Sequence, residues 1–293
     1  MARPVLTARE AAGYLEALDN VLLLTHVRPD GDTVGSAAAL CRALRGMGKA
    51  AYLLPNPEIT GTYEPYAASL WAPEGYVPQS VVSVDIAAPN LLPDNALPYK
   101  GGICLAIDHH GSQEFFAERT CLDADAAACG EIVYDVIRAL GASVTPEIAM
   151  ALYVAVSTDT GCFCYANTNS ATFRAAARLY DAGADLPLLN KIFFRTKSPA
   201  RLALEGMVCS SLRSYRDHAI NIAVITLDML RRAGVTEDDC SDLASLAGQV
   251  RGNRVAITVR ELSVDPPRSK VSLRTDGGVD ASQVCARFGG GGH

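Results

Sequence analysis

Eight imidazole and carboxylate side chains fall in four short stretches of this 293-residue sequence. They are His26, Asp30, Asp32, Asp85, Asp108, His109, His110 and Asp159. Carboxylates that converge on one crevice repel one another, and two divalent cations would supply the missing counter-charge. A donor set of imidazole and carboxylate without thiolate favours Mn²⁺, or Mg²⁺, over structural zinc. The residue types therefore predict a centre that holds two divalent cations.

Most of these side chains follow runs that read as buried strands. The apolar run 103–107 predicts a parallel strand that ends at residues 108–110. The runs 21–25 and 81–86 predict two more strands, and the first leads through a polar loop into a helix over 34–47. Open α/β sheets bind ligands at the carboxyl ends of their strands, so we expect these side chains to meet there.

Further helices are expected over 127–140, 148–156 and 170–181, and the second is apolar almost all round. We therefore expect an α/β protein whose N-terminal domain, residues 1–187, has a mainly parallel sheet flanked by helices. Residues 188–205 are expected to be a linker. Residues 206–293 predict a smaller α/β domain, with strands near 219–226, 254–259 and 271–274 and a helix over 236–247.

Composition fits a globular protein, with 49% hydrophobic and 20% charged residues. No apolar run reaches the roughly 18–20 residues that span a bilayer, and the N-terminus does not read as a secretory signal. The net charge of −6 is uneven, because the first two thirds are acidic and the last third is mildly basic. The nine cysteines form no C-x-x-C pair, so we expect reduced thiols and a cytoplasmic protein. Core positions are expected for Cys41, Cys104, Cys129, Cys162, Cys164 and Cys209.

The order of these motifs resembles the DHH/DHHA1 phosphoesterase superfamily over essentially the whole chain. The matching stretches are residues 26–32 with Gly35-Ser36, then Asp85, then 108–110, then 159–161, and finally the glycine-rich 289–293. Each stretch is weak evidence alone, but all five occur in order on the expected elements. Chain length and the short linker are most similar to the bifunctional oligoribonuclease/pAp phosphatase (nano-RNase) branch.

The resemblance implies a ligand set for each cation. One metal ion would be held by His26, Asp30 and Asp85. The other would be held by Asp32, Asp85, His109 and Asp159. Asp85 would thus bridge the two ions, and a hydroxide between them would attack the phosphorus atom.

The resemblance also implies roles beside the metal ions. Asp108 would orient a neighbouring histidine, and His110 would sit by the scissile phosphate as a hydrogen-bond donor or general acid. The smaller domain would be a DHHA1 domain that binds substrate, with the active site in the cleft between the two domains. Its expected substrate residues are Arg274, Gly290, Gly291, Gly292 and His293. Family members continue past this histidine with small residues, so the sequence leaves the completeness of that motif open.

The leading hypothesis is a metal-dependent enzyme that hydrolyses very short RNA oligonucleotides to nucleoside 5′-monophosphates. The sequence leaves open whether the enzyme also removes the 3′-phosphate from pAp, and whether the protein forms a homodimer. The expected partners are short RNA or mononucleotide bisphosphates, and no membrane. A cyclic-dinucleotide or linear pApA phosphodiesterase is the nearest alternative, and a catalytically silent nucleotide-binding protein is another. The glycine-rich end argues against a family II pyrophosphatase, and the chain length argues against an enzyme resembling RecJ.

Overall fold

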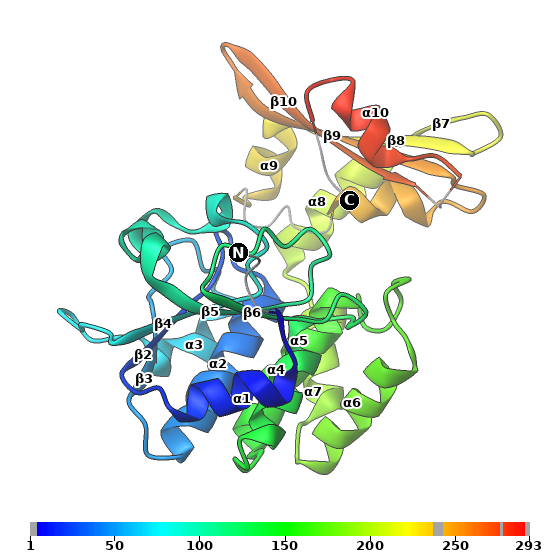
Figure 1. Cartoon of the computed structure of the whole chain (residues 1–293). Coiled ribbons are helices and arrows are strands. Elements are labelled where there is room, and N and C mark those ends of the chain that lie inside the picture. The colour runs from blue at the N-terminus through cyan, green and yellow to red at the C-terminus, as the bar shows by residue number, and fades with distance from the viewer. Residues whose placement is uncertain (1–4, 237–242, 276–277, 291–293) are drawn as a thin grey trace. The chain divides into compact units, whose positions relative to one another are not determined.

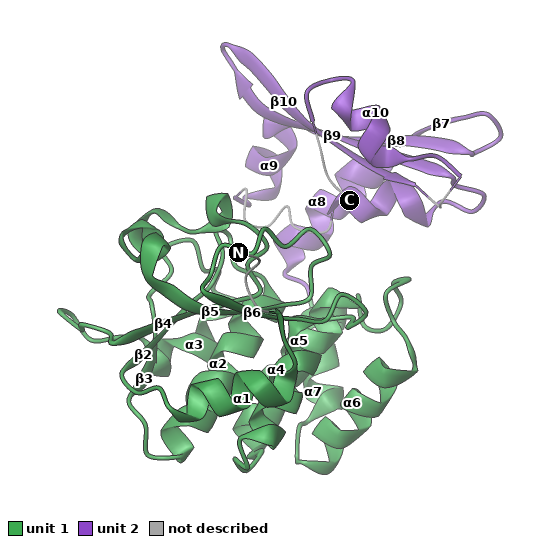
Figure 2. Ribbon diagram, in the orientation of Figure 1, with its two compact units in different colours: residues 1–196 green, residues 197–293 purple. Residues whose placement is uncertain are grey.

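The computed structural model describes residues 5–236, 243–275 and 278–290 (Figure 1). The chain divides into two compact units, Met1–Thr196 and Lys197–His293 (Figure 2). The expected domain boundaries at residues 187 and 206, with a linker between them, stay a prediction.

The first unit is built on a six-stranded sheet with the order β1-β6-β5-β4-β2-β3. The strands are β1 (Val5–Leu6), β2 (Val21–Leu24), β3 (Ala51–Leu53), β4 (Ser80–Val84), β5 (Ile103–Asp108) and β6 (Arg119–Leu122). All five neighbouring pairs are parallel. The expected α/β class with a parallel sheet is therefore confirmed.

Both faces of this sheet are covered. One face packs against the helices α1 (Ala8–Glu16), α2 (Gly31–Gly46), α4 (Cys129–Ala139) and α5 (Pro146–Asp159) (Figure 1). The other face carries the 3₁₀ segments η2 (Pro89–Leu91) and η3 (Asp94–Gly102). Side chains alternate along each strand, so Leu23 joins the helical core while Leu22 and Leu24 join the opposite one.

Helices α2 and α5 lie close together because α2 has glycine at two of its contact positions. A Cβ atom on Gly35 would overlap the Ala151 carbonyl oxygen and come within 3.0 Å of the Ala155 nitrogen. A Cβ atom on Gly31, one turn earlier, would overlap the side chain of Thr158. This close approach brings the first turn of α2 and the last turn of α5 to the same edge of the sheet.

The rest of the first unit includes short helical segments. These are α3 (Glu64–Ala67), η1 (Ala68–Leu70), α6 (Ser170–Asp181), α7 (Leu186–Asn190) and the π-helical turn η4 (Lys191–Arg195). Helix α6 matches the expected range. The region predicted as a linker is largely helical, and a hydrogen bond from Tyr153 to Asn190 ties α7 to α5.

The second unit has a four-stranded mixed sheet with the order β10-β9-β8-β7, in which only β8 and β9 pair in parallel among the described residues. Its elements are α8 (Pro199–Ser211), β7 (Arg213–Tyr215), β8 (Ile220–Ile225), α9 (Leu227–Ala233), η6 (Leu243–Gln249), β9 (Val255–Val264), β10 (Pro267–Thr275) and α10 (Ala281–Ala286). The helix expected over 236–247 falls partly outside the described residues, and its described end is the 3₁₀ segment η6.

Two expectations about thiols and membranes can be compared with the described part of the chain. Its eight cysteines are free, but Cys164 and Cys209 are exposed, contrary to the expectation that they fill the core. Cys164 lies in the turn after α5, where its apolar sequence neighbours do not imply burial. Within the described ranges, no helix is both long enough and apolar enough to cross a membrane.

Candidate metal centre

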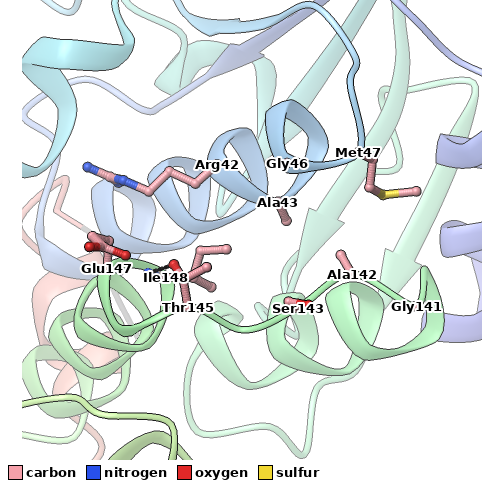
Figure 3. A pocket seen from close by; sticks show the side chains of 10 residues that line it. All are labelled: Arg42, Ala43, Gly46, Met47, Gly141, Ala142, Ser143, Thr145, Glu147 and Ile148. Carbon is pink, nitrogen blue, oxygen red and sulfur yellow. Dashed lines mark hydrogen bonds between the residues drawn. The ribbon is translucent and has the colours of Figure 1, made fainter.

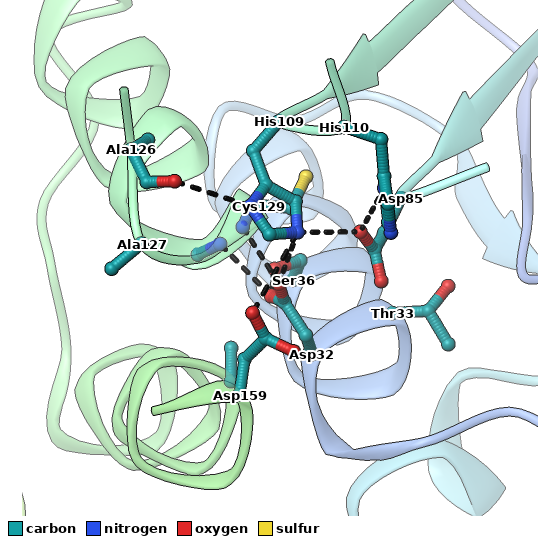
Figure 4. Close-up of polar contacts among 12 residues, drawn as sticks. Asp32, Thr33, Ser36, Asp85, His109, His110, Ala126, Ala127, Cys129 and Asp159 are labelled. Carbon is teal, nitrogen blue, oxygen red and sulfur yellow. Dashed lines mark hydrogen bonds and ion pairs between the residues drawn. The ribbon is translucent and has the colours of Figure 1, made fainter. Parts of the chain in front are cut away.

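Three neighbouring strands carry the candidate ligands to one edge of the sheet. His26 follows β2, Asp85 follows β4 directly, and Asp108 is the last residue of β5. Because β2, β4 and β5 are adjacent and parallel, their carboxyl ends lie side by side. Asp32 in the first turn of α2 and Asp159 at the end of α5 reach the same place (Figure 4). The fold thus gathers residues that are up to 133 positions apart, from 26 to 159.

One group of possible ligands forms around His26. Its Nε2 atom lies 3.5 Å from Asp30 Oδ1 and 3.8 Å from Asp85 Oδ2. Its other ring nitrogen, Nδ1, lies 2.7 Å from the carbonyl oxygen of Val27. A carbonyl oxygen can only accept, so Nδ1 carries the proton of the neutral ring and Nε2 presents a lone pair to the two carboxylates. This is the arrangement in which a histidine binds a metal ion.

A second group forms around His109. Its Nε2 atom lies 3.7 Å from Asp32 Oδ2, 3.5 Å from Asp85 Oδ1 and 3.7 Å from Asp159 Oδ2 (Figure 4). Its Nδ1 atom lies 3.2 Å from the carbonyl oxygen of Ala126. As in His26, Nδ1 therefore carries the proton of the neutral ring, and Nε2 presents a lone pair to the carboxylates. The two oxygens of Asp85 therefore face two different imidazoles, as a shared ligand requires.

Asp32 is held in place by the start of helix α4. Its carboxylate accepts hydrogen bonds from the backbone N–H groups of Cys129 (2.7 Å) and Gly130 (3.0 Å) and from the Ser36 hydroxyl (2.9 Å). The N-cap residue of α4, Ala128, has no side chain that can cap these groups. Asp32, which lies on α2, accepts these N–H groups instead, and the positive end of the α4 dipole favours the negative charge of its carboxylate.

Asp85 is the least satisfied carboxylate of the centre. It is 3% exposed, its backbone has the left-handed φ of 59°, and its Oδ1 atom has no hydrogen-bond partner. Burial raises the pKa of Asp85 well above its usual value, and the charges of Asp32 and Asp30 raise it further. Strained backbone and an unsatisfied buried carboxylate both cost stability, so Asp85 is a candidate for a functional role.

The other titratable groups respond to the same crowding. Burial, together with the charge of Asp32, raises the pKa of Asp159 to about 7. Burial lowers the pKa of His26, but the interaction with Asp30 outweighs it and the net shift is upward. A cluster of this kind takes up protons when it lacks counter-charge, and divalent cations would replace those protons. The residues present therefore fit the binding of metal ions.

The resemblance implies a place for His110 beside the metal ions, although Asp85, His109 and His110 also form a group whose donor atoms lie within 4.8 Å of one another. The Nδ1 atom of His110 lies 3.5 Å from Asp85 Oδ1 but donates a 2.8 Å hydrogen bond to Asp108 Oδ1. That hydrogen bond raises the pKa of His110, because it favours the charged ring. Nδ1 is thus occupied, while Nε2 on the other side of a one-third exposed ring is available to a substrate.

Sequence reasoning missed two side chains that support the centre. The Thr33 hydroxyl donates to the Val84 carbonyl oxygen and fastens α2 to the end of β4. Gln113, which is 5% exposed, donates to Asp108 Oδ2. The position of Thr33 beside Asp32 was a usable signal, whereas the sequence does not distinguish Gln113 from any polar loop residue.

The predicted substrate residues of the second unit are described only in part. Arg274 lies on β10 opposite Ala256 and is exposed, and Gly290 is exposed after α10. Gly291, Gly292 and His293 lie outside the described residues. The substrate-binding roles of all five stay predictions.

A surface hollow of about 500 Å³ lies between the end of α2 and the start of α5 in the first unit (Figure 3). Its lining comes from the C-terminal end of α2, including Arg42 and Met47, and from the start of α5, including Thr145 and Glu147. The candidate ligands lie at the opposite ends of both helices. Glu147 turns back onto the start of α5, where bonds from its own N–H and from the Thr145 hydroxyl lower its pKa. We assign no function to this hollow.

Comparison with known proteins identifies the family of the chain. The family model described as the DHH family, N-terminal domain, matches residues 20–156. The bifunctional oligoribonuclease and PAP phosphatase NrnA of Thermus thermophilus is 33% identical, over 97% of this chain and 85% of that protein. The chain belongs to the DHH family.

Two further proteins are similar to this chain over nearly its whole length. The protein of the same name from Bacillus subtilis is 26% identical, over 94% of this chain and 87% of its own length. The crystal structure of an exopolyphosphatase-related protein from Bacteroides fragilis superposes with a TM-score of 0.87 at 22% identity, covering 100% of this chain and 91% of that one. At that identity the structural likeness shows the shared fold alone.

Proposed function

We propose that this protein is a metal-dependent phosphoesterase that hydrolyses very short RNA oligonucleotides to nucleoside 5′-monophosphates. We also propose that it removes the 3′-phosphate of pAp. The observation that carries the proposal is the pair of imidazoles, His26 and His109, whose Nε2 lone pairs face the two oxygens of Asp85. The bifunctional names of the relatives support the choice of substrate.

We assign the ligands to two divalent cations, with Mn²⁺ as the first choice. One set is His26, Asp30 and Asp85. The other set is Asp32, Asp85, His109 and Asp159. In the groups His26–Asp30–Asp85 and Asp32–His109–Asp159, the donor atoms lie within 4.8 Å of one another. Bound cations would lower the pKa of a water molecule and polarise the phosphate oxygens.

The side chains around the cations have separate tasks in this proposal. The carbonyl oxygens of Val27 and Ala126 hold the two ligand imidazoles in one tautomer. His110 directs Nε2 at the phosphate, as a hydrogen-bond donor or as the acid that protonates the leaving oxygen. Arg274 and the glycine-rich end would bind a second phosphate or a base of the substrate.

The test is a rate comparison on four substrates: pAp, a diribonucleotide, a 24-mer RNA and a cyclic dinucleotide, each with Mn²⁺ or Mg²⁺. The proposal expects the diribonucleotide and pAp to be hydrolysed fastest, with 5′-monophosphate products. Asp85→Asn is the matched inactive control. A preference for the cyclic dinucleotide would instead select the phosphodiesterase alternative, and no turnover of any substrate would reject the enzyme.

A further inference from the structure

The side chain of Gln113 is buried against the carboxylate of Asp108. Its Nε2 atom donates to Asp108 Oδ2 at 2.5 Å and to the carbonyl oxygen of Ile86 at 2.9 Å. Its Oε1 atom accepts the backbone N–H of Phe115 at 3.1 Å. Two acceptors on one side and a donor on the other permit only one orientation of the amide. Gln113 is therefore a fixed donor, aimed at a single oxygen of Asp108.

The other oxygen of Asp108 is engaged by the histidine pair. Asp108 Oδ1 accepts the His110 Nδ1 proton at 2.8 Å and the backbone N–H groups of His109 and His110 at 2.8 and 3.3 Å. Asp108 itself is fully buried. Rotation of this carboxylate would therefore break bonds at both of its oxygens, and Gln113 resists that rotation from the far side.

The direction of the His110 ring follows from the direction of the carboxylate. A hydrogen bond from Nδ1 fixes the ring plane, and Nε2 then points away from Asp108 along a set line. If the carboxylate turned, Nδ1 would lose its acceptor and the ring would be free to turn with it. Pre-set direction matters because misplacing a reacting group by about 1 Å can cost 100-fold in rate.

We infer that Gln113 is a positioning residue, which fixes the plane of Asp108 and thereby aims His110 Nε2 at the substrate phosphate. The catalytic part of this inference rests on the proposed function, whereas the orientation of the ring does not. The competing interpretation is that Gln113 only fastens its loop. That loop has further ties, because Gln113 N–H donates to the His110 carbonyl and Glu114 N–H donates to that of Ala87.

The test uses the full chain with Gln113→Met, which keeps the length of the side chain and removes its donors. Tyr153→Phe is the control, since it removes a partly buried side-chain hydrogen bond from the same unit, the bond to Asn190. With Mn²⁺ and pAp, we expect kcat of Gln113→Met to fall roughly 10–100-fold while KM and the Mn²⁺ affinity change less than about threefold. Tyr153→Phe should leave kcat unchanged.

A second readout needs neither metal nor activity. Histidine labelled with ¹⁵N in the metal-free protein reports the tautomer of each ring, and the His110 signals are assigned by their loss in His110→Gln. We expect His110 to be protonated at Nδ1 in the wild type and to move towards averaged ring-nitrogen shifts in Gln113→Met. Unchanged His110 signals, an unchanged kcat, or a kcat loss that follows weakened Mn²⁺ binding would each overturn the inference. If the wild type hydrolyses no substrate, the proposed function fails, and the NMR signals alone decide whether Gln113 orients His110.

Discussion

Replacing Gly35 with alanine should destabilise the protein although alanine is the better helix former. In an open helix, Gly→Ala is worth about 1 kcal/mol of added stability. Here the new Cβ atom would overlap the carbonyl oxygen of Ala151 and lie 3.2 Å from the Cβ atom of Ala155. Both neighbours belong to α5 and neither can rotate aside, so α2 has to move by about 1 Å to regain ordinary contact distances near 3.5 Å.

The magnitude follows from the two opposing effects. Overpacking of this kind costs about 1–3 kcal/mol, and we take the upper part of that range, about 2–3 kcal/mol, because the obstacle here is a backbone oxygen. After the propensity gain, we expect a net loss of about 1–2 kcal/mol, or a midpoint lower by roughly 3–6 °C for a unit of this size. The shift also separates Asp32 on α2 from Asp159 on α5. Metal sites tolerate only about 0.2 Å in ligand distances, so Mn²⁺ affinity should fall about tenfold or more.

The assay is thermal and urea unfolding of the metal-free protein, with Mn²⁺ titration by calorimetry. Gly13→Ala is the control, because Gly13 lies inside helix α1 and a Cβ atom there would meet nothing within 4 Å. Gly13→Ala should raise the free energy of unfolding by about 0.5–1 kcal/mol and leave Mn²⁺ binding unchanged. The reasoning fails if Gly35→Ala is as stable as Gly13→Ala, or if it binds Mn²⁺ like the wild type.

Three further predictions concern the charges of the centre. The metal-free protein should become more stable as the pH falls from 8 towards 5: the folded pKa of Asp159 is about 7, above its ordinary value of 3.8, so the folded state takes up a proton first. The raised pKa of His26 acts in the same direction, and urea midpoints that fall over this range would contradict the assignment. Because binding displaces protons, Mn²⁺ affinity should weaken as the pH falls over the same range, by up to about tenfold per pH unit for each proton released. Calorimetry in buffers of different ionisation enthalpy counts the released protons, and a count of zero would refute this prediction. Asp85→Asn should stabilise the metal-free protein at pH 8 by about 1 kcal/mol or more, since it removes an unsatisfied buried charge. The same variant should lose Mn²⁺-dependent hydrolysis. A destabilised variant would show that Asp85 supports the fold.

Much of the first unit could be predicted from local patterns. The runs around residues 21, 81 and 103 are continuous and apolar, as strands buried on both faces must be, and they became β2, β4 and β5. Helix α6 matched its expected range because a capping asparagine, Asn169, and a glycine, Gly183, bracket it. The helical turns α7 and η4 were not predicted, and the hydrogen bond between Tyr153 and Asn190 is a tertiary contact that local patterns do not reveal.

The sequence by itself determined the chemical type of the centre. Asp85, His109 and the other candidates are recognisable because they recur at the ends of apolar runs, and carboxylates that converge there need counter-charge. Their meeting at one edge followed from the parallel sheet, since parallel strands end on the same side. The donor set and the expected metals therefore required no coordinates.

Only the tertiary structure decided how each side chain is held and oriented. The Nε2 lone pairs of His26 and His109 are directed by the carbonyl oxygens of Val27 and Ala126, and Asp32 is fastened by the first N–H groups of α4, 97 residues away at Cys129. The role proposed for Gln113 rests on its hydrogen bond to Asp108, which no pattern in the sequence reveals. The physical reason is that hydrogen bonds depend on distance and direction in space. A periodic pattern along the chain fixes which face of an element a residue occupies, but not which distant atom its side chain meets.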